Sequence, residues 1–293
     1  MKNRVHLWVC LIFTVTFCLI APAAAGELQF LTFPAVAPVT ETSLSLPFTL
    51  PASTASAVSF RCSALMDTAT GNRISPDRIS LSYNQKTVGP NQLLTLTPQP
   101  TGGPEAGSTR EFGLQINFLP SDPPGEYEGI IEAVLHHSTQ DTERISLWVK
   151  TRVLPWIKLE RVSGQPFPGF DSLSSLTESN LTITEPLKLL LASNTHWQLY
   201  LRVGTAIPHH DPEFPLQIRI GRPGKAGEEK KTLLANGPAQ LVAAGPPTVV
   251  GDGLTPANYW TELYLSASIA DWRQYPTGNH QLTFYLSGQT ITP

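Results

Sequence analysis

The sequence has few charged residues and few cysteines for its length. Of its 293 residues, 15% are charged and three are cysteines. It also lacks a Gly-x-Ser-x-Gly, a His-Glu-x-x-His and a phosphate-loop pattern, so no motif names a reaction. We therefore expect no enzyme, and neither a cofactor nor a metal. What the chain does contain, 27 prolines and 21 glycines, is typical of many short strands joined by turns.

The amino terminus has the three parts of a secretory signal peptide. Two cations precede an apolar run over residues 7–20, which Ala23-Ala24-Ala25 follows. We predict a signal peptide over residues 1–25 and cleavage before Gly26. A retained membrane anchor is the alternative, but the run is shorter than the ~20 residues that a span needs. The expected location is the periplasm, the cell surface or the extracellular space, with no membrane span in the mature chain.

Cleavage changes both the charge and the cysteine content. It leaves 18 lysines and arginines against 23 acidic residues, a formal net charge of −5, which argues against nucleic acid as a partner. Cys10 and Cys18 leave with the signal peptide, so an internal disulfide cannot form. We expect the remaining Cys62 to be buried as a small hydrophobic residue, because Val58 and Phe60 lie beside it. Pairing of Cys62 between two chains is the alternative.

Alternating apolar and polar residues predict strands along most of the mature chain. In the segment 111–119, Phe112, Leu114, Ile116 and Phe118 alternate with polar residues or glycine, which indicates one buried and one wet face. The strand candidates are residues 27–33, 44–50, 57–65, 79–83, 93–97, 111–119, 127–135, 144–153, 156–162, 181–191, 193–203, 215–220, 259–269 and 280–286. Residues 221–257, rich in glycine and proline, are expected to be irregular.

Two similar turns mark corresponding places in the chain. Asp122-Pro-Pro-Gly-Glu-Tyr127 begins an alternating strand, and Pro276-Thr-Gly-Asn-His280 does the same 153 positions later. The shift keeps side-chain parity, so both strands present equivalent faces to their cores. We therefore predict two similar modules, residues 26–154 and 155–293. Chance similarity of two short pieces is the alternative. The corner residues are Pro124, Gly125, Tyr127, Pro276, Gly278 and His280.

The first turn resembles the Asp-x-Gly-x-Tyr-x-Cys corner of immunoglobulin-like sandwiches, where the tyrosine hydroxyl bonds back to the turn. Gly129 and Leu282 stand at the positions of the disulfide cysteine, and His280 stands at that of the second tyrosine, which excludes the antibody type. The resemblance implies an all-β fold of two tandem immunoglobulin-like antiparallel β-sandwich domains after a cleaved signal peptide. With the signal peptide, the pattern also resembles bacterial secreted sandwiches of the fimbrial-subunit and spore-coat-U kind.

The two turns differ in the length of chain that follows. After Tyr127, 26 residues lead to Val153, enough for two strands, whereas 13 residues follow His280. We therefore expect the second sandwich to lack its last strand. An open edge beside residues 280–286 would leave unpaired backbone groups that a strand from another subunit could fill.

The first apolar segment of the mature chain is the candidate donor strand, through Leu28, Phe30, Leu31 and Phe33. Two alternatives remain open. Residues 27–33 are the first strand of their own sandwich, or residues 289–293 protect the open edge. The residue next to the last is Thr292, where fimbrial subunits often carry a tyrosine.

Four aromatic residues of the second module fall on the parity opposite to the core, namely Tyr200, Trp260, Tyr264 and Tyr285. Exposed aromatic rings on a sheet can stack on sugar rings or dock a partner. The alternatives are that the parity is misjudged or that contact between the modules covers them.

The function that this pattern favours is structural or adhesive. We expect a non-enzymatic exported surface or fimbria-like protein that acts through contacts with other protein subunits, its own copies or pilus-like components. The first alternative is a pair of carbohydrate-binding modules that bind glycans. The second is a periplasmic chaperone of the fimbrial type, although the sequence offers no clear Arg/Lys pair for a cleft.

Overall fold

A computed structural model describes residues 28–51, 54–97, 109–137, 142–162, 181–182, 187–205, 215–221, 231–234, 236–250, 258–269 and 282–291. Strands dominate this part of the chain, and its helical content is one short turn, Pro76–Arg78, so the predicted all-β class is confirmed. No helix among these residues is long and apolar enough to cross a membrane. The predicted signal peptide, residues 1–25, lies outside them.

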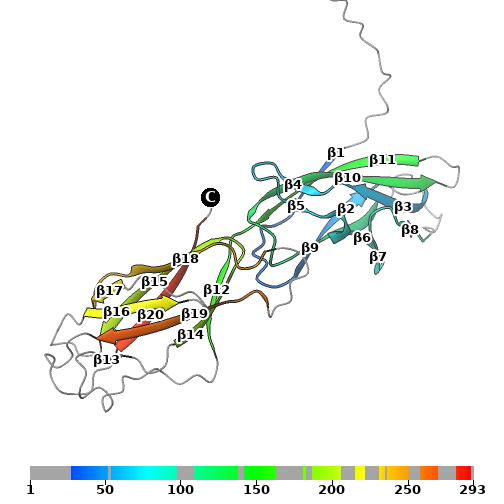
Figure 1. Ribbon diagram of the computed structural model, residues 1–293. Coiled ribbons are helices and arrows are strands. Elements are labelled where there is room, and N and C mark those ends of the chain that lie inside the picture. The colour runs from blue at the N-terminus through cyan, green and yellow to red at the C-terminus, as the bar shows by residue number, and fades with distance from the viewer. Residues whose placement is uncertain are drawn as a thin grey trace, which may run out of the picture.

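The strands between residues 28 and 153, here called the first half, form two sheets (Figure 1). They are β1 (Leu28–Thr32), β2 (Thr42–Leu50), β3 (Ala55–Cys62), β4 (Leu65–Asp67), β5 (Arg73–Ile74), β6 (Ile79–Tyr83), β7 (Lys86–Val88), β8 (Leu93–Thr95), β9 (Arg110–Phe118), β10 (Gly125–His137) and β11 (Thr142–Val153). One sheet has the order β1-β11-β10-β3-β8, with β4 beside β10 and β5 beside β4. The other has the order β2-β9-β6-β7. Neighbours are antiparallel, except that β1 runs parallel to β11.

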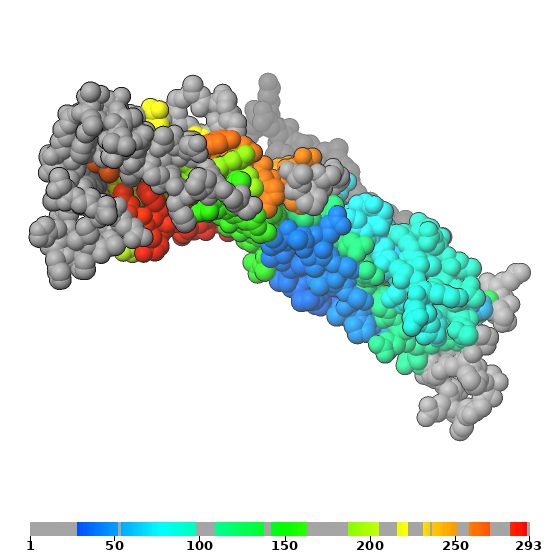
Figure 2. Space-filling view, turned by 90° about the horizontal axis from the view of Figure 1, so that it is seen from below, coloured from blue at the N-terminus to red at the C-terminus, as the bar shows by residue number. Residues whose placement is uncertain are grey.

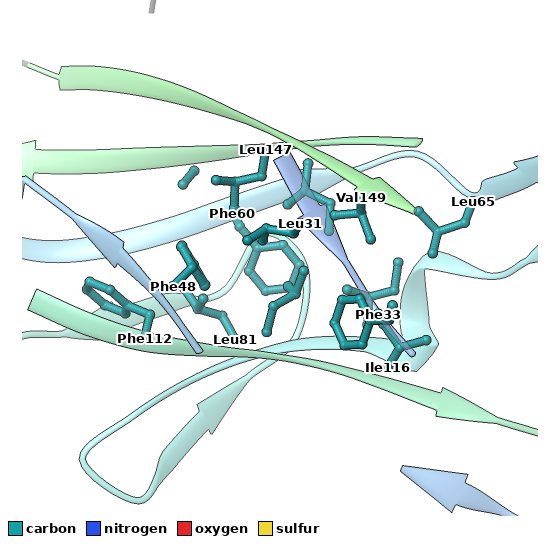
Figure 3. Packing of buried hydrophobic residues seen from close by; sticks show 14 of the residues in the cluster. Leu31, Phe33, Phe48, Phe60, Leu65, Leu81, Phe112, Ile116, Leu147 and Val149 are labelled. Carbon is teal, nitrogen blue, oxygen red and sulfur yellow. The ribbon is translucent and has the colours of Figure 1, made fainter. Parts of the chain in front are cut away.

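Side chains from both sheets of the first half meet in one hydrophobic cluster (Figure 3). Phe112, Leu114, Ile116 and Phe118 of β9 are all buried in it, so the alternation predicted for residues 111–119 is confirmed. Burying one large apolar side chain contributes roughly 1.5–3 kcal/mol. Because the four apolar side chains of β9 recur every second residue, burial of all four fixes which face of the strand points to the core.

The strands between residues 157 and 291, the second half, form two further sheets beside the first half (Figure 1). They are β12 (Ile157–Arg161), β13 (Leu181–Thr182), β14 (Leu187–Ser193), β15 (His196–Thr205), β16 (Pro215–Gly221), β17 (Lys231–Leu234), β18 (Gln240–Gly245), β19 (Thr261–Ile269) and β20 (Leu282–Ile291). One sheet has the order β12-β14-β19-β16-β17, with β13 beside β19. The other has the order β18-β15-β20. A second hydrophobic cluster lies between them.

The prediction of an irregular segment over residues 221–257 is wrong in part, because β17 and β18 lie within it. These strands have four and six residues. Such short strands show little periodicity, and Asn236-Gly237-Pro238 between them reads as a loop signal. Pairing with β16 and β15 holds them in the sheets.

Seven strands of each half correspond in sheet order. The sheet order β2-β9-β6-β7 corresponds to β14-β19-β16-β17, and β10-β3-β8 corresponds to β20-β15-β18, with the same order along the chain. They differ at the edges. In the first half, β11 and β1 continue the sheet beyond β10, whereas in the second half β12 lies beside β14. The strand orders of the two halves are thus similar, while the two modules inferred from the turns, residues 26–154 and 155–293, stay a prediction.

The first corner is tied together by polar contacts. Tyr127 is fully buried, and its hydroxyl donates a hydrogen bond to the Pro123 carbonyl at 2.7 Å. The Asp122 carboxylate accepts bonds from the Leu119 N–H at 2.8 Å and from the Arg78 guanidinium at 2.8 and 3.0 Å. Burial, with Asp122 nearby, raises the pKa of Tyr127 far above its ordinary value, so the hydroxyl remains a donor. The second corner, Pro276, Gly278 and His280, lies outside the described residues.

We predict that Tyr127→Phe lowers the free energy of unfolding by about 1–2 kcal/mol, because the Pro123 carbonyl loses its donor while the ring stays packed. Urea denaturation monitored by circular dichroism measures the change. Tyr83→Phe is the matched control, since the Tyr83 ring packs against Phe112 in the same core and no hydrogen bond of its hydroxyl occurs within the described residues. Equal stability losses in the two variants would contradict the role of the corner bond.

Candidate functional site

β20 is an edge strand over the part of the chain that the structure describes. One side pairs with β15, from Leu282 opposite Thr205 to Ile291 opposite His196. No described strand pairs with its other side. An unpaired strand edge presents a row of N–H and C=O groups that can receive another strand. Over residues 282–286, the edge that the sequence predicts to be open is thus unpaired by any described strand.

The core-facing side chains of β20 are less buried than their counterparts in β10. Ile131 and Ala133 of β10 are 0% and 1% exposed, whereas Phe284 and Leu286, at the positions 153 later, remain half-buried. The strand β11 flanks β10, but no described strand flanks β20 in the same way. Half-buried core residues are what a sandwich with one strand fewer at this edge would show.

The edge strand of the opposite sheet borders the same region. Ile157 and Leu159 of β12 are also half-buried, although they pack against the second hydrophobic cluster. Gly288 of β20 faces β12 so closely that a Cβ atom there would lie 2.7 Å from Ile157 Cδ1. We call the apolar residues at this border the β12–β20 seam. Its members are Ile157, Leu159, Leu282, Phe284 and Leu286.

The candidate donor segment lies within its own half. β1 pairs with β11 from Leu28 opposite Ser146 to Thr32 opposite Lys150. Leu31 and Phe33 are buried in the hydrophobic cluster of the first half, while Leu28 is exposed. The arrangement is that of the alternative in which this segment is the first strand of its own sandwich. Its donation to another chain stays a prediction, and would have to remove two buried side chains from their core.

The exposed face of β1 carries Phe30, which is 70% exposed and stacks on Trp148 of β11 at a centroid distance of 6.0 Å.

The alternative in which residues 289–293 protect the open edge of β20 is not supported over residues 289–291. Residues 289–291 belong to β20 and pair with β15, so they do not cover the far side. Residues 292–293 lie outside the described part of the chain.

The four predicted surface aromatics do not form one patch. Tyr200 and Tyr285 lie on β15 and β20, whereas Tyr264 lies on β19 and Trp260 just before it, in the other sheet. Tyr285 is 57% exposed, and the Arg202 guanidinium lies 5.8 Å from its ring centroid. The other three are half-buried. The structure therefore separates them into two pairs.

Tyr264 is held by charged neighbours. Its hydroxyl donates a hydrogen bond to Glu262 at 2.8 Å, and the Lys188 ammonium lies 2.6 Å from that carboxylate and 5.9 Å from the Tyr264 ring centroid. The hydrogen bond from Lys188, and then that from Tyr264, hold the pKa of Glu262 below its usual range. These groups remain partly accessible to solvent, so their attraction stabilises the fold little.

Trp260 lies at a pocket of about 420 Å³ between the two halves. Thr40 and Glu41 of the first half line it, as do Ala192 and Trp260 of the second half. Two further lining residues are Trp156, in the connecting segment (residues 154–156, between β11 and β12), and Lys158 of β12. Sequence reasoning found Trp260 alone among these residues. The others come from separate strands and loops, which no local pattern brings together.

Asn194 joins the two halves beside this pocket. It is buried, and its side-chain oxygen accepts a hydrogen bond from the main-chain N–H of Trp156 at 2.9 Å. Its side-chain nitrogen donates to the Asp122 carbonyl at 3.0 Å and to the Leu154 carbonyl at 3.3 Å. A buried amide with partners on both sides fixes the approach of the first corner to the second half.

Cys62 is half-buried, and its Sγ atom lies 3.9 Å from the Pro76 carbonyl oxygen. Burial raises the pKa of this thiol to about 11. Cys62 packs against the first hydrophobic cluster, as predicted for a small hydrophobic residue, but it is only partly buried.

No protein-family model and no curated protein matches the sequence. Among solved structures, a chaperone–tip adhesion subunit complex of archaic Csu pili from Acinetobacter baumannii is 11% identical, with 90% of this chain and 98% of that chain covered and a TM-score of 0.44. A mutant of the adhesin CfaE from enterotoxigenic Escherichia coli is 9% identical over 92% and 93%, with a TM-score of 0.33. The CupB6 tip adhesin from Pseudomonas aeruginosa is 12% identical over 84% and 87%, with a TM-score of 0.29. Because these scores lie below 0.5, the likenesses carry no weight for the function.

We predict slow, strongly pH-dependent labelling of Cys62. With a pKa of about 11, about 0.1% of the thiol is ionised at pH 8, against roughly a quarter for an unperturbed cysteine of pKa ~8.5. Reaction of the mature chain with iodoacetamide should therefore be about two orders of magnitude slower than in guanidinium-unfolded protein. Its rate should rise tenfold per pH unit from pH 8 to pH 10. Equal rates in folded and unfolded protein would show that the thiol is not protected.

Proposed function

We propose that the chain is a fimbria-like subunit of an exported surface assembly, built from two tandem immunoglobulin-like domains, residues 26–154 and 155–293. In this proposal the second domain accepts a strand from another subunit along β20. The observation that carries the proposal is the far edge of β20, which no described strand pairs, beside the half-buried β12–β20 seam. Exported location rests on the predicted signal peptide.

The strand orders support the immunoglobulin-like assignment. In such sandwiches one sheet has the order A-B-E-D and the other contains C-F-G. The order β12-β14-β19-β16 matches A-B-E-D, and β15-β20 matches C-F. The missing neighbour is strand G, whose counterpart in the first half is β11 beside β10. The first half, in which β11 flanks β10, thus serves as the reference for a sandwich that has strand G.

Insertion of a strand would satisfy two needs of the second half at once. Its backbone would pair with the N–H and C=O groups on the far side of β20, which spans ten residues. Its alternate side chains would enter the seam and bury Phe284, Leu286 and Ile157 more completely. Main-chain bonds supply affinity in this mode, and the side chains that fill the seam supply specificity.

The strand must come from a partner with a suitable free segment. β1 of a second copy is one source, but it is already paired with β11 in its own half. A different subunit, or an assembly chaperone that lends a strand temporarily, requires no such release. The first half, whose strand β10 is flanked by β11 and β3, would then be free to present its surface to other partners.

We predict that a supplied strand stabilises the second half. A copy of residues 142–153, the sequence of β11, is fused after residue 293 through a short glycine-rich linker. It should raise the melting temperature of the mature chain by on the order of 10 °C, because it pairs β20 and covers the seam. Differential scanning calorimetry measures the shift, and size-exclusion chromatography with light scattering checks that the fusion is monomeric.

The matched control carries the same fusion with serine at three of the inward positions of the added copy, those corresponding to Ile145, Leu147 and Val149. It should give less than a third of the shift. If the apolar fusion and the serine fusion leave the melting temperature unchanged, the strand-acceptor function is wrong.

A further inference from the structure

The pocket between the two halves has a lining of unusual composition. Three aromatic residues, Trp156, Tyr259 and Trp260, contribute to it, together with Lys158 and Glu41. Its volume of about 420 Å³ lies in the range of small-molecule sites, roughly 300–1,000 Å³. In Figure 2 part of the orange surface lies near green and blue surfaces in the middle of the elongated molecule.

The pocket exists because a small residue lies between two large ones. Ala192 of β14 is opposite Lys158 of β12, and its neighbour Leu191 is opposite Thr261, the residue after Trp260. The Ala192 side chain is too short to fill the space between Lys158 and Trp260. It is nevertheless buried, since Trp156, Val249 and the partly buried Trp260 pack around it. The floor of the pocket around Ala192 is therefore apolar.

The polar groups at the pocket are balanced in charge. The Lys158 ammonium lies 2.6 Å from a Glu160 carboxylate oxygen and 5.4 Å from the Trp260 ring centroid. Glu41 is exposed, and it acts on Tyr259, whose pKa is raised by burial first and by the Glu41 charge second. The Tyr259 hydroxyl therefore remains protonated beside a carboxylate.

These charges select against ionic ligands. An organic cation would be repelled by the positive charge of the Lys158 ammonium, which lies 5.4 Å from the Trp260 ring centroid. An anion would meet Glu41 and a lysine already neutralised by Glu160. A neutral ligand with one apolar face and several hydroxyl groups meets neither obstacle.

We propose that this pocket binds a neutral saccharide, with one sugar ring stacked against Trp260 and its hydroxyls bonded to Glu41 and Lys158. Aromatic rings offer a broad apolar face, and the carboxylate and ammonium offer an acceptor and donors. The indole N–H of Trp156 is a further feature. Trp156 is 4% exposed, and within the described residues this buried group has no hydrogen-bond partner.

The site is held in place before any ligand binds. Asn194 bonds to Trp156, to Leu154 and to the Asp122 carbonyl, which fixes the connecting segment between the halves. The Val249 and Thr248 N–H groups bond to the Ser193 carbonyl beside the Ala192 floor. A preformed pocket loses little freedom on binding, so even a single sugar should bind measurably.

Ligand-observed NMR on the mature chain, residues 26–293, tests the proposal. The probes are methyl glycosides of glucose, galactose, mannose and N-acetylglucosamine, with lactose and cellobiose as longer neutral sugars and choline and acetate as charged probes. At least one neutral sugar should bind with a dissociation constant of about 1–10 mM, while choline and acetate show no binding at 50 mM.

Variants locate the binding. Trp260→Ala should weaken sugar binding at least tenfold, and Glu41→Ala about threefold to tenfold. Tyr285→Ala, which removes an exposed aromatic from the opposite sheet, is the control and should leave binding unchanged. Circular dichroism melts show which variants stay folded. If Trp260→Ala unfolds the protein, Glu41→Ala still decides the matter, because Glu41 is exposed.

The proposal is overturned if none of the neutral sugars binds at 50 mM, if choline binds in a way that depends on Trp260, or if the folded variants bind sugar as well as the unaltered chain. The protein with the added strand fused after residue 293 provides a separate test. Sugar binding should be the same in fused and unfused proteins, so a failure of strand acceptance leaves the pocket standing, and the reverse also holds.

Discussion

The structure depends on the requirement that both sides of a strand find hydrogen-bond partners. In the first half β10 meets this requirement, with β3 on one side and β11 on the other, and Ile131 and Ala133 are buried as a result. In the second half β20 has β15 on one side only, within the described residues. The same strand order thus gives a closed core in one place and the half-buried seam in the other.

A second dependence lies at the junction of the halves. Asp122 serves the first corner through its carboxylate, which binds Arg78, and serves the junction through its carbonyl, which binds Asn194. One turn therefore sets both the start of β10 and the approach of the second half. The neighbouring Thr195 hydroxyl bonds to the Ile291 carbonyl at the end of β20. The open edge and the junction pocket are consequently connected through a few buried polar groups, although their proposed partners differ.

Sequence patterns predicted the features that depend on local spacing. Alternation gave the inner face of β9, and the turn at Asp122 gave the start of β10. The length of chain after each turn pointed to the edge of β20. The patterns failed at β17 and β18, where four to six residues carry too little periodicity, and they found Trp260 without the residues that share its pocket. They also grouped four aromatics that lie on two different sheets.

By itself, the sequence determined the all-β class, the inner faces of the long strands and the position of the first corner, because these follow from side-chain period and turn chemistry. The tertiary structure alone decided that β1 pairs with β11 in its own half and that Glu41, Lys158 and Trp260 line one pocket. The reason is physical. Strand partners and pocket walls come from segments far apart in the chain, and only the packing of sheets fixes which of them become neighbours.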